Sequence, residues 1–297
     1  MTTWRHWTDR AGSTRCWLSN LMKIAAIQMR SGLDPDANIA ALEPMLAEAV
    51  VAGATYVLTP EVTVVFPENR EQLAGVAAPF EDHPQLRRVG ELARQHNTHL
   101  HIGSLAVPLP DGRFANRSVL FGPDGGIVTT YDKIHLFDAT IAGLNAYRES
   151  ATYAGGEQAV TADLGEFTLG MSICYDMRFP KLYNSLANAG ANLIAVPAAF
   201  TVPTGQAHWH VLLRARAIET GSYVIAAAQG GQHPNGRATY GHSLVIDPWG
   251  RIIAELDHDD PGVLLAEISA DLVTDARERI PALANARNFA LPGALQA

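Results

Sequence analysis

Cysteine is scarce in this sequence, and its scarcity excludes several kinds of protein. The 297 residues include only two cysteines, Cys16 and Cys174. Two cysteines so far apart cannot form a disulfide-rich scaffold, nor a zinc site made of four thiolates. Long apolar runs are also missing, since none reaches the roughly 18 residues that a membrane-spanning helix requires. We therefore expect no membrane partner.

Basic residues are outnumbered by acidic ones. Lys and Arg total 22, Asp and Glu total 30, and the formal net charge is −8. An acidic chain without a basic stripe is a poor ligand for nucleic acid, so no nucleic-acid partner is expected. Hydrophobic residues make up 47% of the chain, which is enough for a sizeable core. These features are typical of a cytoplasmic globular enzyme.

Several well-known catalytic and binding motifs are absent as well. The chain has no G-x-S-x-G, G-x-G-x-x-G or G-x-x-x-x-G-K-[ST] pattern, so serine-hydrolase, dinucleotide-binding and P-loop functions have no support. Two His-x-His pairs, His99 with His101 and His208 with His210, lack a Cys or carboxylate at ligand-like spacing. We interpret them as ordinary polar residues, and we expect no metal and no cofactor.

The first 21 residues differ from the rest of the chain. Residues 1–21 hold three of the five tryptophans and Cys16, and they show no apolar periodicity. This extension suits a disordered arm or a translation start placed too early; its Arg-rich, acid-poor composition also loosely resembles a transit peptide. We expect one domain over residues 22–285, followed by a C-terminal tail at 286–297.

From Met22 onward, strand and helix patterns alternate, as in an α/β protein. Strands are predicted at residues 23–28, 55–59, 99–107, 118–122, 127–132, 167–173, 192–196, 223–228, 243–246, 251–255 and 262–268. Helices are predicted at residues 38–52, 84–97, 180–188 and 206–220. Pro44 predicts either a kink or a late start in the first helix.

Three chemically useful side chains follow predicted strands. Glu61 and Cys174 follow apolar strands, and Lys133 comes just after another predicted strand. In α/β folds the carboxyl ends of strands face the usual ligand crevice, so a base, a cation and a thiol can meet there. Each residue also has an ordinary interpretation: the thiol as a small buried hydrophobe, and the two charged residues as solvated strand ends.

The same residues carry a family resemblance that covers the chain from Met22 to about residue 285. Glu61 in Thr-Pro-Glu, Lys133 in YDKIHLFD and Cys174 in GMSICYDMRFP follow the order of the catalytic triad of the nitrilase superfamily of carbon–nitrogen hydrolases. The segments AAFTVPTGQAHWHVLLRARAIET at 198–220 and YGHSLVIDPWG at 240–250 resemble the Nit branch, which includes deaminated glutathione amidases and ω-amidases. The resemblance implies a four-layer α-β-β-α sandwich and a homodimer or higher homo-oligomer.

The chemistry implied by the resemblance is amide hydrolysis through a thioester on Cys174. Only about 3% of a free thiol is thiolate at pH 7, so Glu61 is expected to act as general base. Lys133 and the backbone N–H of Tyr175 are the expected donors to the oxyanion.

Other residues receive supporting roles by the same resemblance. Glu149 stands where related chains carry a second glutamate, with a solvated loop carboxylate as the alternative. Arg178 is a candidate to bind a substrate carboxylate, or to pair with a neighbouring acid for structural reasons only. Phe200 and Thr201 are expected to line the pocket, whereas His208 and Trp209 are expected to shape the start of the following helix.

The expected substrate is a small carboxylate-bearing amide, such as an ω-amide of a 2-oxo acid or deaminated glutathione. N-carbamoyl amino acids, aliphatic amides and nitriles are alternatives within the superfamily. A non-catalytic binding or scaffold protein on the same fold is an alternative of a different class. The complete set of Glu61, Lys133 and Cys174 argues against it, because a scaffold does not need all three.

Overall fold

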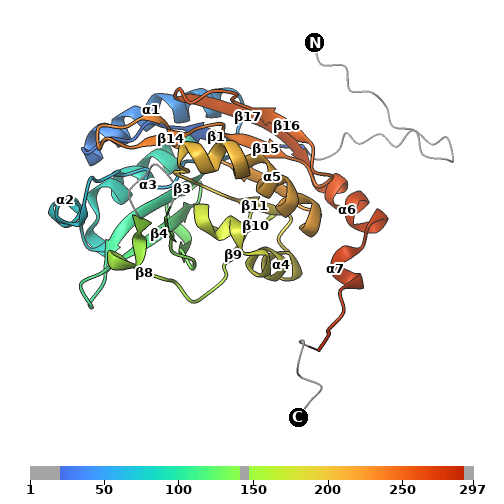
Figure 1. Ribbon diagram of the computed structural model, residues 1–297. Coiled ribbons are helices and arrows are strands. Elements are labelled where there is room, and N and C mark those ends of the chain that lie inside the picture. Colours follow the sequence, from blue (N-terminus) through green and yellow to red (C-terminus); the bar gives the residue numbers. More distant parts are fainter. Residues whose placement is uncertain (1–20, 141–146, 291–297) are drawn as a thin grey trace.

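The computed structural model describes residues 21–140 and 147–290 (Figure 1). Two β-sheets form the middle of the molecule. The first has the strand order β17-β1-β2-β3-β4-β5, with β8 beside β4, and the second has the order β16-β15-β12-β11-β10-β9. The strands of the first sheet are β1 (Leu21–Gln28), β2 (Tyr56–Leu58), β3 (His99–Pro108), β4 (Phe114–Phe121), β5 (Ile127–Asp132), β8 (Tyr153–Ala154) and β17 (Gly262–Ser269). Those of the second sheet are β9 (Thr161–Asp163), β10 (Thr168–Met171), β11 (Leu193–Ala195), β12 (Tyr223–Ala226), β15 (Leu244–Ile246) and β16 (Ile252–Glu255).

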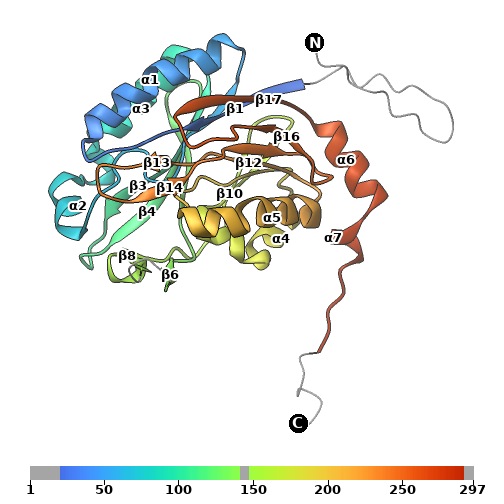
Figure 2. The ribbon, with the colours of Figure 1, turned by 45° about the horizontal axis from the view of Figure 1, so that its top comes forward.

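Helices cover the outer face of each sheet (Figure 2). Helices α1 (Pro35–Val51) and α3 (Pro84–His96) lie on the first sheet, and α4 (Pro180–Asn188) and α5 (Val202–Thr220) lie on the second. The remaining short elements are α2 (Arg70–Val76), α6 (Ala270–Arg279), α7 (Ala282–Asn285), the 3₁₀ turns η1 (Phe80–Asp82), η2 (Glu149–Ala151) and η3 (Cys174–Arg178), and the paired strands β6 (Asp138–Ala139) with β7 (Tyr147–Arg148) and β13 (Gly230–Gln232) with β14 (Ala238–Tyr240). None of the helices described is both long and apolar enough to cross a membrane.

The side chains of strand β1 contribute to two separate hydrophobic clusters, one on each face of the first sheet. Successive side chains of a strand point to opposite faces, and all of the β1 side chains from Ile24 to Ile27 are buried. Ala25 and Ile27 pack in the cluster under α1 and α3, whereas Ile24 and Ala26 pack in the cluster between the sheets. This double burial explains why the strand reads as a continuous apolar run rather than an alternating one.

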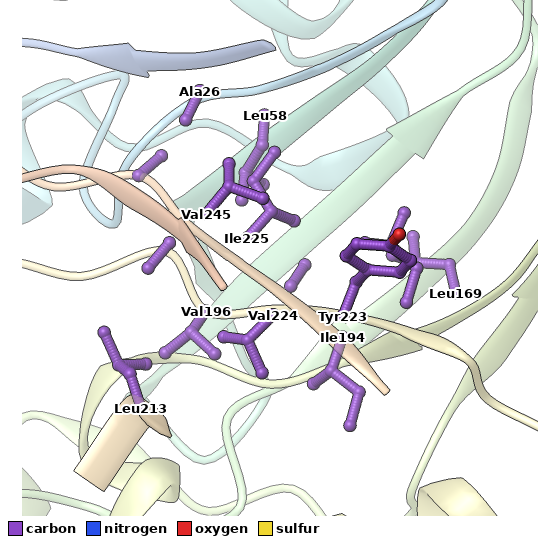
Figure 3. Packing of buried hydrophobic residues seen from close by; sticks show 14 of the residues in the cluster. Ala26, Leu58, Leu169, Ile194, Val196, Leu213, Tyr223, Val224, Ile225 and Val245 are labelled. Carbon is purple, nitrogen blue, oxygen red and sulfur yellow. The ribbon is translucent and has the colours of Figure 1, made fainter. Parts of the chain in front are cut away.

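The core between the sheets joins residues far apart in the sequence. Figure 3 shows Ala26 and Leu58 of the first sheet beside Ile225 and Val245 of the second. Leu213 of α5 belongs to the same cluster but lies on the far side of the second sheet. The arrangement is the predicted four-layer α-β-β-α sandwich, and the fold prediction is confirmed.

Most predicted elements are present, with shifts at their ends. Helix α4 and strand β5 have the predicted bounds, but α1 begins at Pro35, three residues early. The side chain of Asp34 caps it by accepting hydrogen bonds from the N–H groups of Asp36 and Ala37, and the helix continues through Pro44. Of the two alternatives predicted from Pro44, a kink or a late start, the late start is wrong. The extension at 1–21 and the tail at 286–297 fall largely outside the described residues, and their boundaries stay predictions.

Candidate active site

Glu61, Lys133 and Glu149 converge at one edge of the first sheet. Strands β2 and β5 run in the same direction, because β2 is parallel to β3 and two antiparallel pairings lead from β3 to β5. Glu61 and Lys133, which follow these strands, therefore emerge at the same edge. Lys133 Nζ donates to Glu61 Oε1 at 2.8 Å and to the two carboxylate oxygens of Glu149 at 3.0 and 2.9 Å.

This cluster is buried and its charges are coupled. The side chain of Lys133 is 2% exposed and that of Glu61 is 7% exposed. Burial disfavours the ammonium form of Lys133, but the charges of Glu149 and Glu61 outweigh burial and raise the pKa of Lys133 well above its ordinary value. Lys133 therefore stays protonated and remains a hydrogen-bond donor across the neutral pH range.

Asn116 on β4 completes the cluster, and the sequence patterns did not single it out. Its Nδ2 donates to Glu61 Oε1 at 3.0 Å and to Glu149 Oε1 at 3.2 Å. One amide thus bridges two carboxylates that would otherwise repel each other. The second oxygen of Glu61 accepts a hydrogen bond from the N–H of Ala199 at 3.0 Å, which leaves the carboxylate little freedom to rotate.

Cys174 begins the turn η3, shortly after strand β10 of the second sheet ends at Met171. Its φ of 47° is a left-handed value that a residue with a Cβ rarely adopts, and its N–H donates to the carbonyl of Pro197 at 2.9 Å. Such a sharp strand-to-helix turn holds the side chain in one direction. Cys174 is buried, and its pKa is raised well above the ordinary thiol value by burial and then by the charge of Glu61, while Lys133 acts in the opposite direction. The thiol is thus kept neutral, and both the Glu61 carboxylate and the Lys133 ammonium act on it electrostatically.

Comparison with known proteins identifies the family of this chain. Residues 23–278 match the family described as carbon-nitrogen hydrolase. A deaminated glutathione amidase of Yersinia enterocolitica is 38% identical over 268 residues, which cover 89% of this chain and 92% of that protein. The chain belongs to the carbon-nitrogen hydrolase family. It is accordingly a hydrolase with amidase activity.

Solved structures of carbon-nitrogen hydrolases support the same assignment. The C. elegans NitFhit protein superposes with a TM-score of 0.83 at 36% identity, covering 90% of this chain; the chain spans 65% of that longer protein. A mutant amidase from Nesterenkonia sp. AN1 superposes with a TM-score of 0.72 at 28% identity, over 88% of this chain and 98% of that one. That amidase bears the product of acrylamide addition at its active-site cysteine.

Asp176 connects η3, the turn that begins with Cys174, to the segment that carries Lys133. The carboxylate is fully buried and accepts hydrogen bonds from Tyr131 Oη at 2.7 Å and from the N–H of Ile173 at 2.9 Å. It also contacts the N–H of His135 at 3.0 Å and His135 Nδ1 at 2.7 Å. Sequence reasoning missed this residue, although its place inside the CYDMRFP motif was a signal.

The residues expected to line the substrate pocket have different surroundings. Tyr175 lies in the first turn of η3, where N–H groups lack helical partners, and its N–H has no acceptor among the described residues. Phe200 is buried, 5.4 Å from the guanidinium carbon of Arg178. Thr201 is also buried, and its hydroxyl bonds the hydroxyl of Thr204 at 2.8 Å. A role of Thr201 in the pocket stays a prediction.

His208 and Trp209 were expected to shape the start of the helix, but they lie inside α5, which begins at Val202. Both have polar partners of their own. Trp209 Nε1 donates to the carbonyl of His242 at 2.8 Å, and His208 Nδ1 lies 3.3 Å from Arg178 Nη2. Arg178 has no carboxylate partner among the described residues. The interpretation of Arg178 as a purely structural ion pair therefore has no support in this part of the chain.

His101 is a structural histidine. It is fully buried on β3 between Tyr56 Oη at 2.6 Å and Ser118 Oγ at 2.7 Å, and burial lowers its pKa to about 3. Within residues 21–140 and 147–290, no cluster of three or more His, Cys, Asp or Glu side chains could hold a metal ion.

Proposed function

We propose that this hydrolase cleaves the amide bond of a small carboxylate-bearing substrate through a thioester on Cys174. The substrates considered are an ω-amide of a 2-oxo acid or deaminated glutathione, the compound in the name of the Yersinia relative. The observation that carries the proposal is the Lys133 ammonium held between Glu61 and Glu149 beside a buried thiol. A lysine on the surface would be solvated by water, so the burial of Lys133 between two carboxylates indicates a role other than that of a solvated strand end.

In the first half of the reaction, Glu61 takes the proton of the Cys174 thiol as the sulfur attacks the carbonyl carbon. The carbon–nitrogen bond then breaks, and Glu61 returns the proton to the departing ammonia or amine. In the second half, Glu61 removes a proton from water, the resulting hydroxide attacks the thioester, and the thiol leaves with that proton. Such proton transfer typically contributes about 10²–10⁴-fold to the rate.

The negative charge of each tetrahedral intermediate lies on the former carbonyl oxygen. Lys133 and the N–H of Tyr175, which has no acceptor within the described part of the chain, are the proposed donors to that oxygen. Loss of one such donor typically costs roughly 3–4 kcal/mol of transition-state stabilisation. Glu149 and Asn116 act through Lys133 and Glu61, which they hold in place.

Arg178 is the proposed partner of the substrate's carboxylate. Its guanidinium lies 5.8 Å from the ring centre of Tyr175, the residue that follows Cys174. A guanidinium that forms no ion pair with a carboxylate of the described chain can bind the substrate's carboxylate through two parallel hydrogen bonds. N-carbamoyl amino acids, aliphatic amides and nitriles stay in the substrate panel as competing candidates.

The deciding experiment measures ammonia or amine release from this panel. We expect kcat/KM to be highest with ω-amides of 2-oxo acids, and we expect Cys174→Ala to abolish the release. Cys16→Ser is the matched control because it removes the other thiol. Equal release by the wild type and Cys174→Ala would refute the assignment of the nucleophile.

Mass spectrometry after a rapid acid quench tests the intermediate itself. An acyl adduct is expected on Cys174, in larger amount when Glu61→Gln slows hydrolysis of the thioester. An adduct on Cys16 would contradict the mechanism.

Assembly and location belong to the same proposal. By resemblance to the Nit branch, we propose a homodimer or higher homo-oligomer that works in the cytoplasm. The assembly is tested by light scattering on the purified protein, and the location by fractionation of cells that produce it.

A further inference from the structure

The backbone that follows Glu61 has a rare conformation. The φ of Val62 is 54°, a left-handed value that a β-branched residue seldom adopts. Asn97, Cys174 and His242 are the other non-glycine residues with such a φ in the part of the chain that the structure describes. Strained positions of this kind persist only where neighbouring groups hold them, and they gather at functional sites. The turn after the proposed general base therefore needs groups that hold it.

The peptide unit between Glu61 and Val62 is held at both of its polar atoms. The N–H of Val62 donates to Ser104 Oγ at 2.9 Å. The carbonyl of Glu61 accepts a hydrogen bond from Gln229 Nε2 at 3.0 Å. Ser104 lies on β3 of the first sheet, whereas Gln229 follows β12 of the second. The plane of this peptide cannot turn without breaking one of the two hydrogen bonds.

A β-bulge aims Ser104 at this peptide. The β3–β4 pairing shifts register between Ile102 and Leu105, and Ser104 lies within that shift. Bulges redirect side chains and are common next to active sites. A Cβ on Gly103 would lie 2.2 Å from the carbonyl oxygen of Thr59, so only glycine allows this close approach. The bulge thus brings the hydroxyl of Ser104 to the segment that follows β2.

Gln229 acts on Glu61 in two ways. Its side-chain amide donates to the Glu61 carbonyl and to Ser31 Oγ, the latter at 2.7 Å, and its Oε1 accepts from the N–H of Ser31 at 2.9 Å. Its backbone N–H donates to the carbonyl of Ala198 at 2.9 Å. The next residue, Ala199, donates its N–H to Glu61 Oε2 at 3.0 Å. Gln229 therefore holds the backbone of Glu61 directly, and it also fixes the segment that binds the carboxylate.

The carboxylate of Glu61 has exact contacts to keep. Its Oε1 accepts hydrogen bonds from Lys133 Nζ at 2.8 Å and from Asn116 Nδ2 at 3.0 Å. Because the Cα of Glu61 belongs to the held peptide, a change of Val62 to negative φ would move that Cα and the carboxylate with it. A misplacement of about 1 Å can cost about 10²-fold in rate.

We propose that Ser104 and Gln229 are positioning residues that hold the Glu61–Val62 peptide in its strained conformation and so direct the carboxylate of Glu61 at its partners. Both side chains are fully buried, and both act through Glu61 rather than on the reacting atoms. The inference rests on the function proposed above, because the direction of Glu61 affects the rate only if that carboxylate transfers protons.

The first test removes one hydrogen bond from the peptide. Ser104→Ala leaves the N–H of Val62 without its acceptor, so kcat for amide hydrolysis should fall by about 10- to 100-fold while KM changes little. Ser222→Ala is the matched control, because that serine is also fully buried and hydrogen-bonded but lies at the opposite end of β12 from Gln229. The control should lose stability to urea to a similar extent and keep the kcat of the wild type.

A second measurement reports the place of the carboxylate without turnover. Burial and then the charge of Glu61 raise the pKa of Cys174. A carboxylate that has moved away raises this pKa less. In a Cys16→Ser background, Ser104→Ala should therefore move the inflection in the rate of alkylation by iodoacetamide to lower pH. Ser222→Ala should leave the inflection in place.

Two further variants address the strain and the second hydrogen bond. Asparagine adopts left-handed φ values more readily than valine, and position 62 is only partly buried, so Val62→Asn should restore part of the kcat that Ser104→Ala loses. Gln229→Met keeps the length of the side chain but removes its hydrogen bonds, so it should lower kcat and shift the inflection in the same direction as Ser104→Ala. Urea denaturation checks that each variant is folded.

The outcomes separate this inference from the proposed function. Equal losses of kcat in Ser104→Ala and Ser222→Ala, or an unmoved inflection in Ser104→Ala, would overturn the inference while leaving the Cys174 thioester intact. No recovery of kcat when Val62→Asn is added to Ser104→Ala would overturn it as well. Absence of any acyl adduct on Cys174 with every amide would instead overturn the proposed function.

Discussion

The thiol of Cys174 lies between two opposing influences. Glu61 raises its pKa and Lys133 lowers it, but burial is the largest cause of the rise. A neutral thiol in the resting enzyme avoids indiscriminate reaction with electrophiles, since the thiolate is the reactive form. The proposed mechanism then forms the thiolate only while a substrate is being attacked.

This balance predicts a divergence between thiol reactivity and amidase activity. In a Cys16→Ser background, Glu61→Gln removes the negative charge beside Cys174 while Lys133 stays, so the pKa of the thiol should fall. The inflection in the rate of alkylation by iodoacetamide should move to lower pH, although amide hydrolysis should fall by about 10²–10⁴-fold. Glu48→Gln, at an exposed site on α1, is the control. An unmoved inflection would show that Glu61 does not act on the thiol.

At the residue scale, the site residues that could be predicted from the sequence were those with a signal in their own segment of the chain. Glu61, Lys133 and Cys174 could be singled out because together they supply a base, a cation and a thiol at strand ends, and the family motifs added Glu149. Asn116 could not, because an amide within a strand is common and its significance depends on two glutamates distant in sequence. The roles proposed for these residues stay predictions until their variants are measured.

At the element scale, Asp176 connects η3 to the segment after β5. Asp176→Asn replaces one acceptor oxygen by an amide NH₂ group that faces N–H and O–H donors, so hydrogen bonds are lost inside the fold. The free energy of unfolding should fall by about 1–3 kcal/mol, measured by urea denaturation. Because Asp176 is a positioning residue, kcat should fall while KM changes little.

Two variants test this assignment. Tyr131→Phe removes a single donor to Asp176 and should cost less than Asp176→Asn. Asp163→Asn, at an exposed carboxylate that accepts one backbone hydrogen bond, should leave kcat unchanged. If Asp176→Asn raises KM but spares kcat, Asp176 does not position η3.

His101 joins three neighbouring strands through Tyr56 on β2 and Ser118 on β4, and it makes stability depend on pH. Its pKa is about 3 in the folded protein, against about 6.5 in the unfolded chain. Between these values the unfolded chain binds more protons, so the free energy of unfolding falls as pH falls, by about 1.4 kcal/mol per pH unit from this group.

The matching experiment follows urea denaturation between pH 7 and pH 4. His101→Gln should be less stable than the wild type at pH 7 but should lose less stability on acidification. His258→Gln, at an exposed histidine, should keep the wild-type slope. A wild-type slope in His101→Gln would show that His101 is not the group responsible.

Elements with strong local signals were predicted well, and those that depend on distant partners were not. Helix α4 begins at Pro180, and β5 follows a Gly-rich hairpin turn, so local sequence sets both starts. Strands β13 and β14 have three residues each, and β14 is held partly by a bridge between Thr239 and Thr201. Such short strands exist because tertiary neighbours complete them, and no periodicity in the sequence can reveal them.

At the scale of the whole molecule, the α/β alternation alone did not determine the architecture. Alternating strands and helices suit a single doubly wound sheet as well as two stacked sheets. The family resemblance indicated stacking, and the double burial of β1 is the feature that makes it physically possible, since both faces of that strand meet apolar layers. The net charge of −8 likewise said little about the site, where Lys133 is protonated and Arg178 has no acid partner within the described chain.

The outer face of α5 carries the last prediction. Val211 and Ile218 are 67% and 54% exposed, and because they are seven residues apart they lie on the same face of the helix. Trp249, 48% exposed, precedes Gly250, which packs closely on Ile218. Adjacent apolar side chains on an exposed face are typical of a protein–protein interface, so we expect the proposed homodimer to form across α5.

Changing Val211 and Ile218 together to Glu should therefore shift the protein from dimer to monomer in size-exclusion chromatography with light scattering. Two buried charges would oppose association, because each would lose its hydration in the interface. Val51→Glu, at a valine that is 89% exposed at the end of α1, is the matched control and should leave the dimer intact. A double variant that remains dimeric would place the interface on another face of the sandwich, and a wild type that is monomeric at micromolar concentration would contradict the homodimer itself.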